Sequence, residues 1–166
     1  MRLRDLLLAG LILLGLAFLT QMLDRAERAA GTARAVDGDS LALGDTRVRL
    51  AGIDAPELSQ TCGAADALWP CGRAAQDHLA DLVRGRAVEC AGEGHDAYAR
   101  LIAACTVVQP TGAPLDLAGA LVEAGLAVAR DRSGYGAREA DARRAGRGIW
   151  SGAFARPEDW RAAHPR

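Results

Sequence analysis

The sequence predicts an α+β domain built on a small closed β-barrel of five strands, preceded by a hydrophobic helix. Segments in which apolar and polar residues alternate, as in half-buried strands, are interrupted by a helical pattern. This order lacks the regular strand–helix alternation of a parallel sheet, which favours an α+β barrel. The chain has 166 residues, and 50% of them are hydrophobic, enough for one domain with a substantial core.

The N-terminal residues form a separate hydrophobic segment. Residues 6–19 are an unbroken apolar run, and a helix needs about 20 residues to cross a bilayer core. Arg2 and Arg4 precede this run, which predicts a cytoplasmic N-terminus and a domain beyond the membrane. We therefore expect residues 1–23 to be an uncleaved inner-membrane anchor that holds the domain in the periplasm or outside the cell. Secretion after cleavage of a signal peptide is the alternative.

The remaining elements follow from hydrophobic periodicity. Residues 24–31 are charged or small and are predicted to be a linker, which leaves 32–166 as the folded domain. The turn sequences DGD and GDT separate the first three strands. The expected strands lie at 32–36, 40–43, 46–50, 87–90 and 101–108. About three helices are expected, at 72–84, from 117 to near 125 and at 137–145, and the sequence PEDWRAA is compatible with a short last one.

The four cysteines are an even number in a chain predicted to be exported, which favours disulfide bonds. A zinc site is the competing interpretation, but the chain contains no C-x-x-C sequence. Three pairings are possible. A Cys62–Cys71 bond would close a short loop, and a Cys90–Cys105 bond would join two predicted strands.

The residues RVRLAGIDAPE, at 47–57, combine an alternating strand with carboxylates at its end. Asp37 belongs to an Asp-Gly turn and is predicted to be structural, whereas the turn does not require Asp39. If Asp39 and Asp54 lie on neighbouring strand ends, they can share a hard cation such as Ca²⁺, which prefers oxygen ligands. The formal net charge of −1 argues against a protein that coats nucleic acid electrostatically. Since the chain contains no lysine, a charged side chain that contacts phosphate must be an arginine.

Five segments, in this order and spacing, resemble the staphylococcal nuclease (thermonuclease) family: VDGDS, RVRLAGIDAPE, DAYARL, LVEAGLA and ARRAGRGIW. The resemblance covers residues 32–154, nearly the whole predicted domain. It implies an OB-type barrel with helices, which agrees with the order of elements above. It also implies Ca²⁺-dependent hydrolysis of phosphodiester bonds, with DNA and RNA as substrates.

The resemblance implies a role for each matching residue of the metal and phosphate site. Asp39 and Asp54 correspond to the carboxylates that bind Ca²⁺. Ala55 stands where the family's calcium site uses the backbone carbonyl of a threonine, so the change of side chain is expected to matter little. Arg49 and Arg100 correspond to the two arginines that clamp the scissile phosphate.

The same resemblance assigns the water and the rest of the substrate. Glu57 corresponds to the glutamate proposed as the general base for the attacking water. Tyr98 matches a tyrosine that contacts a substrate phosphate, and Tyr135 is a looser match to aromatic residues of the nucleotide pocket. Ala97 stands where a related nuclease has a lysine, which predicts a weaker phosphate contact. Arg47 is expected to be a surface residue.

The leading hypothesis is therefore an exported, membrane-anchored, Ca²⁺-dependent nuclease, which we expect to be a monomer without a protein partner. A non-catalytic OB-fold module that binds nucleic acid is the second hypothesis. A structural domain of the cell envelope, in which the charges form surface ion pairs, is the third. The tryptophans are expected to be packing residues: Trp69, Trp150 and Trp160.

Overall fold

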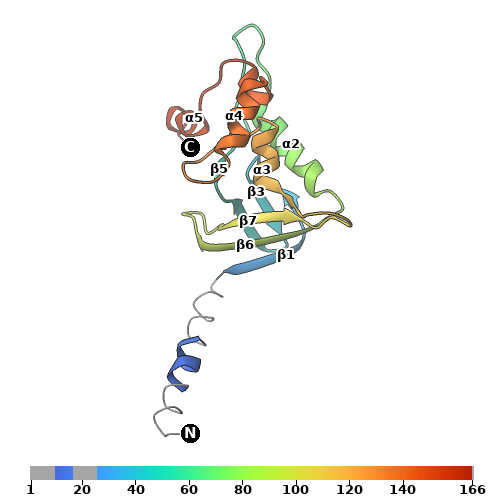
Figure 1. Ribbon diagram of the computed structural model, residues 1–166. Helices are drawn as coiled ribbons and strands as arrows, with labels where there is room; N and C mark the ends of the chain where they lie inside the picture. The colour runs from blue at the N-terminus through green and yellow to red at the C-terminus, as the bar shows by residue number, and fades with distance from the viewer. Residues whose placement is uncertain (1–9, 17–25, 166) are drawn as a thin grey trace.

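The computed structural model describes residues 10–16 and 26–165 (Figure 1). Residues 10–16 are helical. Most of the expected membrane anchor, at 1–9 and 17–23, lies outside the described residues. Among the residues that are described, no helix is both long enough and apolar enough to cross a membrane.

A seven-stranded sheet forms the centre of the domain (Figure 1). Its strands are β1 (Glu27–Thr32), β2 (Arg34–Ala35), β3 (Ser40–Leu43), β4 (Thr46–Leu50), β6 (Ala87–His95), β7 (Leu101–Val107) and β8 (Leu115–Asp116). Their order is β1-β6-β7-β4-β3-β2, and β8 pairs with β7. The β4–β7 pair is parallel, and the other pairs are antiparallel. A separate antiparallel pair joins β5 (Ile53–Asp54) to β9 (Val128–Ala129).

The predicted α+β class is correct, but the predicted closed five-stranded barrel is wrong. The strand order is an open path whose ends are β1 and β2, and no ladder between the described residues joins these ends. The two strands are separated by a single residue, Ala33, and they pair with different partners, β6 and β3. The first stretch of the domain is therefore divided between the two edges of the sheet instead of closing it.

Strand β1 also occupies most of the segment that was predicted to be a linker. Its residues pair with β6 from Glu27 opposite Gly92 to Thr32 opposite Ala87. The sequence ERAAGT gives no apolar alternation because almost all of its side chains are exposed. The backbone pairing with β6, which is not visible in this sequence, forms the strand.

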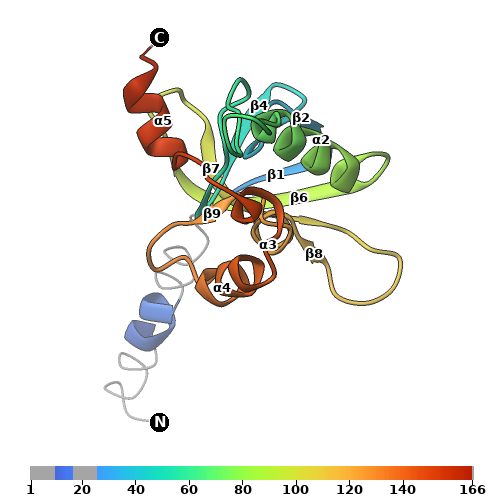
Figure 2. The ribbon, with the colours of Figure 1, turned by 90° about the horizontal axis from the view of Figure 1, so that it is seen from above.

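The predicted helices are present, each within one or two residues of its expected bounds, and further helical segments exceed the three expected. They are α2 (Cys71–Val83), α3 (Leu117–Glu123), α4 (Gly136–Arg144), the 3-10 helix η1 (Gly148–Ser151) and α5 (Pro157–Ala163). Helices α2, α3 and α4 lie on the side of the sheet away from β1 (Figure 1). Helix α5 stands apart from them, and Pro157 at its start has the φ angle that a first helical turn requires (Figure 2).

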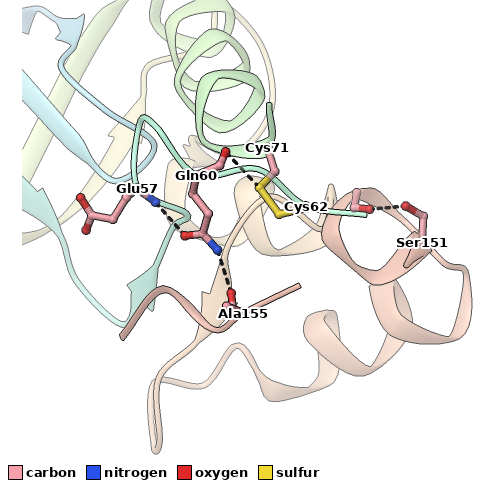
Figure 3. The surroundings of a disulfide bond; sticks show 7 residues. Glu57, Gln60, Cys62, Cys71, Ser151 and Ala155 are labelled. Atoms are coloured by element: carbon pink, nitrogen blue, oxygen red, sulfur yellow. Dashed lines mark hydrogen bonds between the residues drawn. A yellow bond between two sulfur atoms is a disulfide. The ribbon is translucent and has the colours of Figure 1, made fainter. Parts of the chain in front are cut away.

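Two disulfide bonds, Cys62–Cys71 and Cys90–Cys105, are present. Cys90 and Cys105 are direct cross-strand neighbours on β6 and β7. Cys71 is the first residue of α2, so its bond to Cys62 ties this helix to the loop that precedes it (Figure 3). Both bonds agree with the expectation of disulfides in an oxidising compartment.

Candidate active site

A cleft of about 900 Å³ gathers most of the predicted site residues. It lies between the ends of β3 and β4, the loop after β5, the β6–β7 turn and helix α5. The predicted residues that line it are Asp39, Arg49, Ala55, Glu57, Tyr98 and Arg100. Asp54 is buried and joins the same site through the arginines that it contacts. The metal, catalytic and substrate-binding residues predicted from the sequence therefore lie in one site, with the exception of Tyr135.

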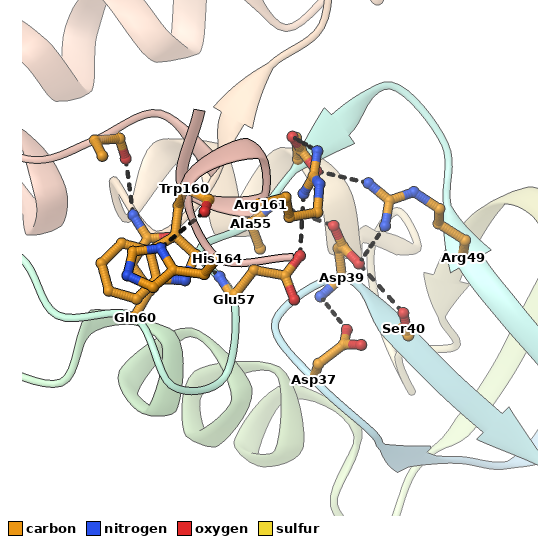
Figure 4. Close-up of polar contacts among 12 residues, drawn as sticks. Asp37, Asp39, Ser40, Arg49, Ala55, Glu57, Gln60, Trp160, Arg161 and His164 are labelled. Atoms are coloured by element: carbon orange, nitrogen blue, oxygen red, sulfur yellow. Dashed lines mark hydrogen bonds and ion pairs between the residues drawn. The ribbon is translucent and has the colours of Figure 1, made fainter. Parts of the chain in front are cut away.

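Arg49 contacts both predicted calcium ligands, and Figure 4 shows its contact with Asp39. One guanidinium nitrogen lies 2.8 Å from Asp39 Oδ1, and the other lies 2.7 Å from Asp54 Oδ1. The side chains are 16%, 6% and 7% exposed for Arg49, Asp39 and Asp54, so these ion pairs are shielded from water. Pairs of this kind are short and directional, and they fix the plane of the guanidinium.

Burial and several neighbouring groups have opposing effects on the pKa of Asp39. Burial raises its pKa to about 7, and the neighbouring charges of Asp37 and Asp54 add to this rise. Arg49 opposes it, as does the hydrogen bond that the Ala55 N–H donates to Asp39 Oδ2 at 3.1 Å. The ionised form of Asp39 therefore depends on the cations around it.

Arg100 is oriented from the other side of the cleft. Its Nε and a terminal nitrogen each lie 2.7 Å from Asp96 Oδ2, and a further N–H donates to Ser40 Oγ at 2.7 Å. Burial raises the pKa of Asp96, but hydrogen bonds from Arg100 and from backbone N–H groups outweigh this and hold it below its usual value. Asp96 positions Arg100. The sequence did not reveal this role, because the segment DAYAR is equally typical of an exposed turn.

Glu57 is held by backbone packing and by an unexpected arginine. Its N–H donates to Gln60 Oε1 at 3.2 Å, and Gln60 in turn donates to the Ala155 carbonyl at 2.7 Å (Figure 3). A Cβ atom at Gly72 would lie 1.7 Å from the Glu57 carbonyl oxygen, so the start of α2 packs directly on this backbone. The position of Glu57 therefore depends on α2 and on the C-terminal segment.

The unexpected arginine is Arg161 of α5 (Figure 4). It makes two contacts with Asp54, of 3.1 and 2.8 Å, and one of 3.1 Å with Glu57 Oε1. Because 107 residues separate Arg161 from Asp54, no local spacing could predict this contact. The hydrogen bond to Asp54 is the main reason that the pKa of Arg161 lies above its usual value.

Four predictions about neighbouring side chains have mixed outcomes. Tyr98 lies on the cleft, is 68% exposed and has its ring 5.5 Å from the Arg100 guanidinium. Tyr135 is not among the residues that line the cleft; its hydroxyl donates to Asp116 Oδ1 at 3.1 Å instead. Arg47 is exposed, as expected for a surface residue, and it lines the cleft. Trp160, which was expected to be a packing residue, also lines the cleft.

The acidic residues have the chemistry of a calcium site without forming a complete one. Asp39, Asp54 and the Ala55 carbonyl supply only oxygen atoms, which suits Ca²⁺. Within residues 10–16 and 26–165, no three acidic, histidine or cysteine side chains converge on a point that would hold a metal ion. Since Ca²⁺ takes about 6–8 oxygen ligands, water and substrate oxygens would have to complete its coordination.

Comparisons with known proteins agree with this geometry. The family model described as staphylococcal nuclease homologue matches residues 47–152. The succinoglycan biosynthesis protein ExoI of Rhizobium meliloti (strain 1021) is 33% identical over 130 residues, which cover 75% of this chain and 66% of ExoI. The chain thus spans just under two thirds of the length of that relative. The family match includes Arg49, Asp54, Glu57 and Arg100 and ends before Arg161. The chain belongs to the staphylococcal nuclease homologue family.

Proposed function

We propose that this protein is a Ca²⁺-dependent nuclease that hydrolyses phosphodiester bonds of DNA and RNA. The observation that carries this proposal is the presence in one cleft of two carboxylate-braced arginines and a glutamate. Membership of the nuclease family supports nucleic acid as the substrate. The cleft, rather than the overall charge of the chain, provides the positive groups that a phosphate needs.

Arg49 and Arg100 are suited to bind the phosphate that is cleaved. Asp39 and Asp54 hold Arg49, while Asp96 and Ser40 hold Arg100. A guanidinium has several N–H donors in a planar fork, so each arginine can keep these contacts and still donate to phosphate oxygens. Both cations would be in place before the reaction, which lowers the cost of stabilising the charge that develops on phosphorus.

Glu57 would accept a proton from the water that attacks phosphorus. The new bond joins the water oxygen to phosphorus, and the bond to the leaving oxygen breaks as that oxygen takes the electron pair. Asp39, Asp54 and the Ala55 carbonyl would hold Ca²⁺, which when bound supplies positive charge for the phosphate oxygens. Gln60 holds the backbone of Glu57 and Arg161 holds its carboxylate at the cleft wall.

The test is digestion of single-stranded DNA and RNA by the purified protein in Ca²⁺ or in excess EGTA. Glu57→Gln should lower kcat by about 10²–10⁴, the usual contribution of a general base. Glu158→Gln on α5 is the matched control and should retain full activity, since Glu158 pairs with Arg156 and does not line the cleft. Activity that is indifferent to EGTA, or undiminished in Glu57→Gln, contradicts the proposal. Succinoglycan is a suitable comparison substrate, because the relative is named for its biosynthesis.

The same experiment separates the proposal from a binding-only module. A complex with single-stranded DNA that persists in Ca²⁺ without cleavage would favour the module.

We further propose that the domain acts outside the cytoplasm, anchored by residues 1–23 or released from them. The two disulfide bonds support an oxidising compartment. Thiol labelling of the denatured protein from a reduced and an unreduced cell extract would test whether these bonds form in the cell.

A further inference from the structure

Helix α5 forms one wall of the cleft and is fixed there by contacts with the Glu57 loop. Ahead of the helix, the Gly63 N–H donates to the Ala153 carbonyl at 2.7 Å, and Gln60 donates to the Ala155 carbonyl at 2.7 Å. Within the helix, Arg161 contacts both Asp54 and Glu57. The side chains of α5 therefore have a defined position relative to the group that would activate water.

Two aromatic rings of this wall are stacked face to face. Trp160 of α5 and His164, the residue that follows the helix, are stacked with ring centroids 3.8 Å apart and an angle of 18° between their planes (Figure 4). Both line the cleft, together with Leu58, whose side chain is 40% exposed. Trp160 directly precedes Arg161 in the sequence. The stacked pair therefore lies beside the charged cluster and not at a distant part of the surface.

The cleft is also larger than a phosphate group needs. Its volume of about 900 Å³ is at the upper end of the ~300–1,000 Å³ range for pockets that hold whole small molecules. Charged groups occupy its centre, Tyr98 stands on the β6–β7 turn, and the aromatic pair stands on α5. A charged track flanked by aromatic rings is the usual composition of sites for single-stranded nucleic acid.

We infer that Trp160 and His164 form a stacking subsite for the base of a nucleotide next to the scissile phosphate; this inference rests on the proposed function. Arg161 fixes the position of this subsite relative to Glu57, since it joins the same helix to Glu57. Stacking requires a base whose face is free, so the subsite favours single-stranded over duplex substrates. It is tolerant of sequence, because every base presents a π face.

The experiment compares an intact fluorescent oligonucleotide with oligonucleotides that carry one tetrahydrofuran abasic residue at successive positions. Affinity is measured by anisotropy in EGTA, and KM and kcat are measured in Ca²⁺. One abasic position should weaken binding by the wild-type protein about 5- to 150-fold, the equivalent of ~1–3 kcal/mol for one stacked base. In His164→Ala and Trp160→Ala this intact-to-abasic ratio should fall towards one.

His78→Ala on α2 is the matched control, because it removes an imidazole that does not line the cleft. It should retain the wild-type ratio. His164 is exposed, so its variant tests the inference even if Trp160→Ala weakens the packing of α5. An unchanged ratio in both variants, or equal binding of all oligonucleotides by the wild type, overturns the subsite while leaving cleavage intact. Base-dependent binding without cleavage in any condition would instead support the subsite and refute the nuclease.

Discussion

The Asp39–Arg49 pair makes a quantitative prediction about stability. Replacing Arg49 by Met removes the cation but keeps much of the side-chain volume. Among the described residues, Arg49 is the only cation in ion-pair contact with Asp39, whereas Asp54 also contacts Arg161. The substitution therefore leaves one buried carboxylate, Asp39, without a counter-charge and leaves the other partly compensated.

The magnitude follows from the burial of the pair. At 2.8 Å and an effective dielectric constant of about 20, two unit charges attract by roughly 6 kcal/mol, before the cost of desolvation is subtracted. Breaking a buried pair from one side costs about 3–5 kcal/mol. Asp39→Asn should cost only about 1 kcal/mol, since Arg49 keeps its contact with Asp54 at 2.7 Å and one hydrogen bond is weakened. The double variant should resemble Asp39→Asn, not the sum of the two.

The assay is urea unfolding in EDTA at pH 8, where Asp39 is ionised because its pKa is about 7. The folded state binds the Asp39 proton more tightly than the unfolded state, so this group's contribution to stability is lost as pH rises from about 4 to 7. The penalty of Arg49→Met should accordingly shrink at pH 5. Arg47→Met, an exposed arginine on the same strand, is the control and should stay within about 0.5 kcal/mol of wild type. Additive effects of the two single substitutions would refute the pairing.

Three further predictions concern the support of the site. Gly72→Ala should lower both the melting temperature and kcat, because its Cβ would meet the Glu57 carbonyl at 1.7 Å, and normal values would contradict the packing. Replacing Cys90 and Cys105 by Ala should lower the free energy of unfolding by about 3 kcal/mol, as the chain-entropy model gives for a loop of this length; mass spectrometry of the unreduced protein checks the bond itself. Tyr135 should ionise near pH 12, because burial raises its pKa, so the difference in absorbance at 295 nm between wild type and Tyr135→Phe should rise there rather than near pH 10.

The parts of the fold that the sequence predicted are those with a clear local pattern. Strand β4 and helix α2 have apolar residues at the spacing of their buried faces, so both could be predicted. Strand β1 could not, because its residues are small and exposed and only pairing with β6 makes them a strand. The two-residue strands β5 and β9 depend in the same way on their partners.

In the candidate site, too, some contacts follow from local sequence and others depend on distant parts of the chain. Asp39, Arg49 and Asp54 lie within 16 residues of sequence, so turn and strand geometry alone bring them close. Arg161 reaches the same carboxylates from the far end of the chain, and this depends on how the segment around Ala155 docks onto Gln60. Tyr135 does not line the cleft for a related reason: its hydroxyl donates to Asp116, and that contact depends on the packing of α4.

The Cys62–Cys71 bond lies on the same loop as Glu57. The side chain of Gln60 accepts a hydrogen bond from the Glu57 N–H, and Cys71 Sγ lies 3.5 Å from the Gln60 carbonyl oxygen (Figure 3). Reduction of the bond would remove the covalent link between this loop and α2 and leave the packing of Gly72 on the Glu57 carbonyl and the hydrogen bond from the Gly72 N–H to the Gln60 carbonyl. If the cleft has the proposed activity, the reduced protein should hold Glu57 less firmly and cleave more slowly than the oxidised protein.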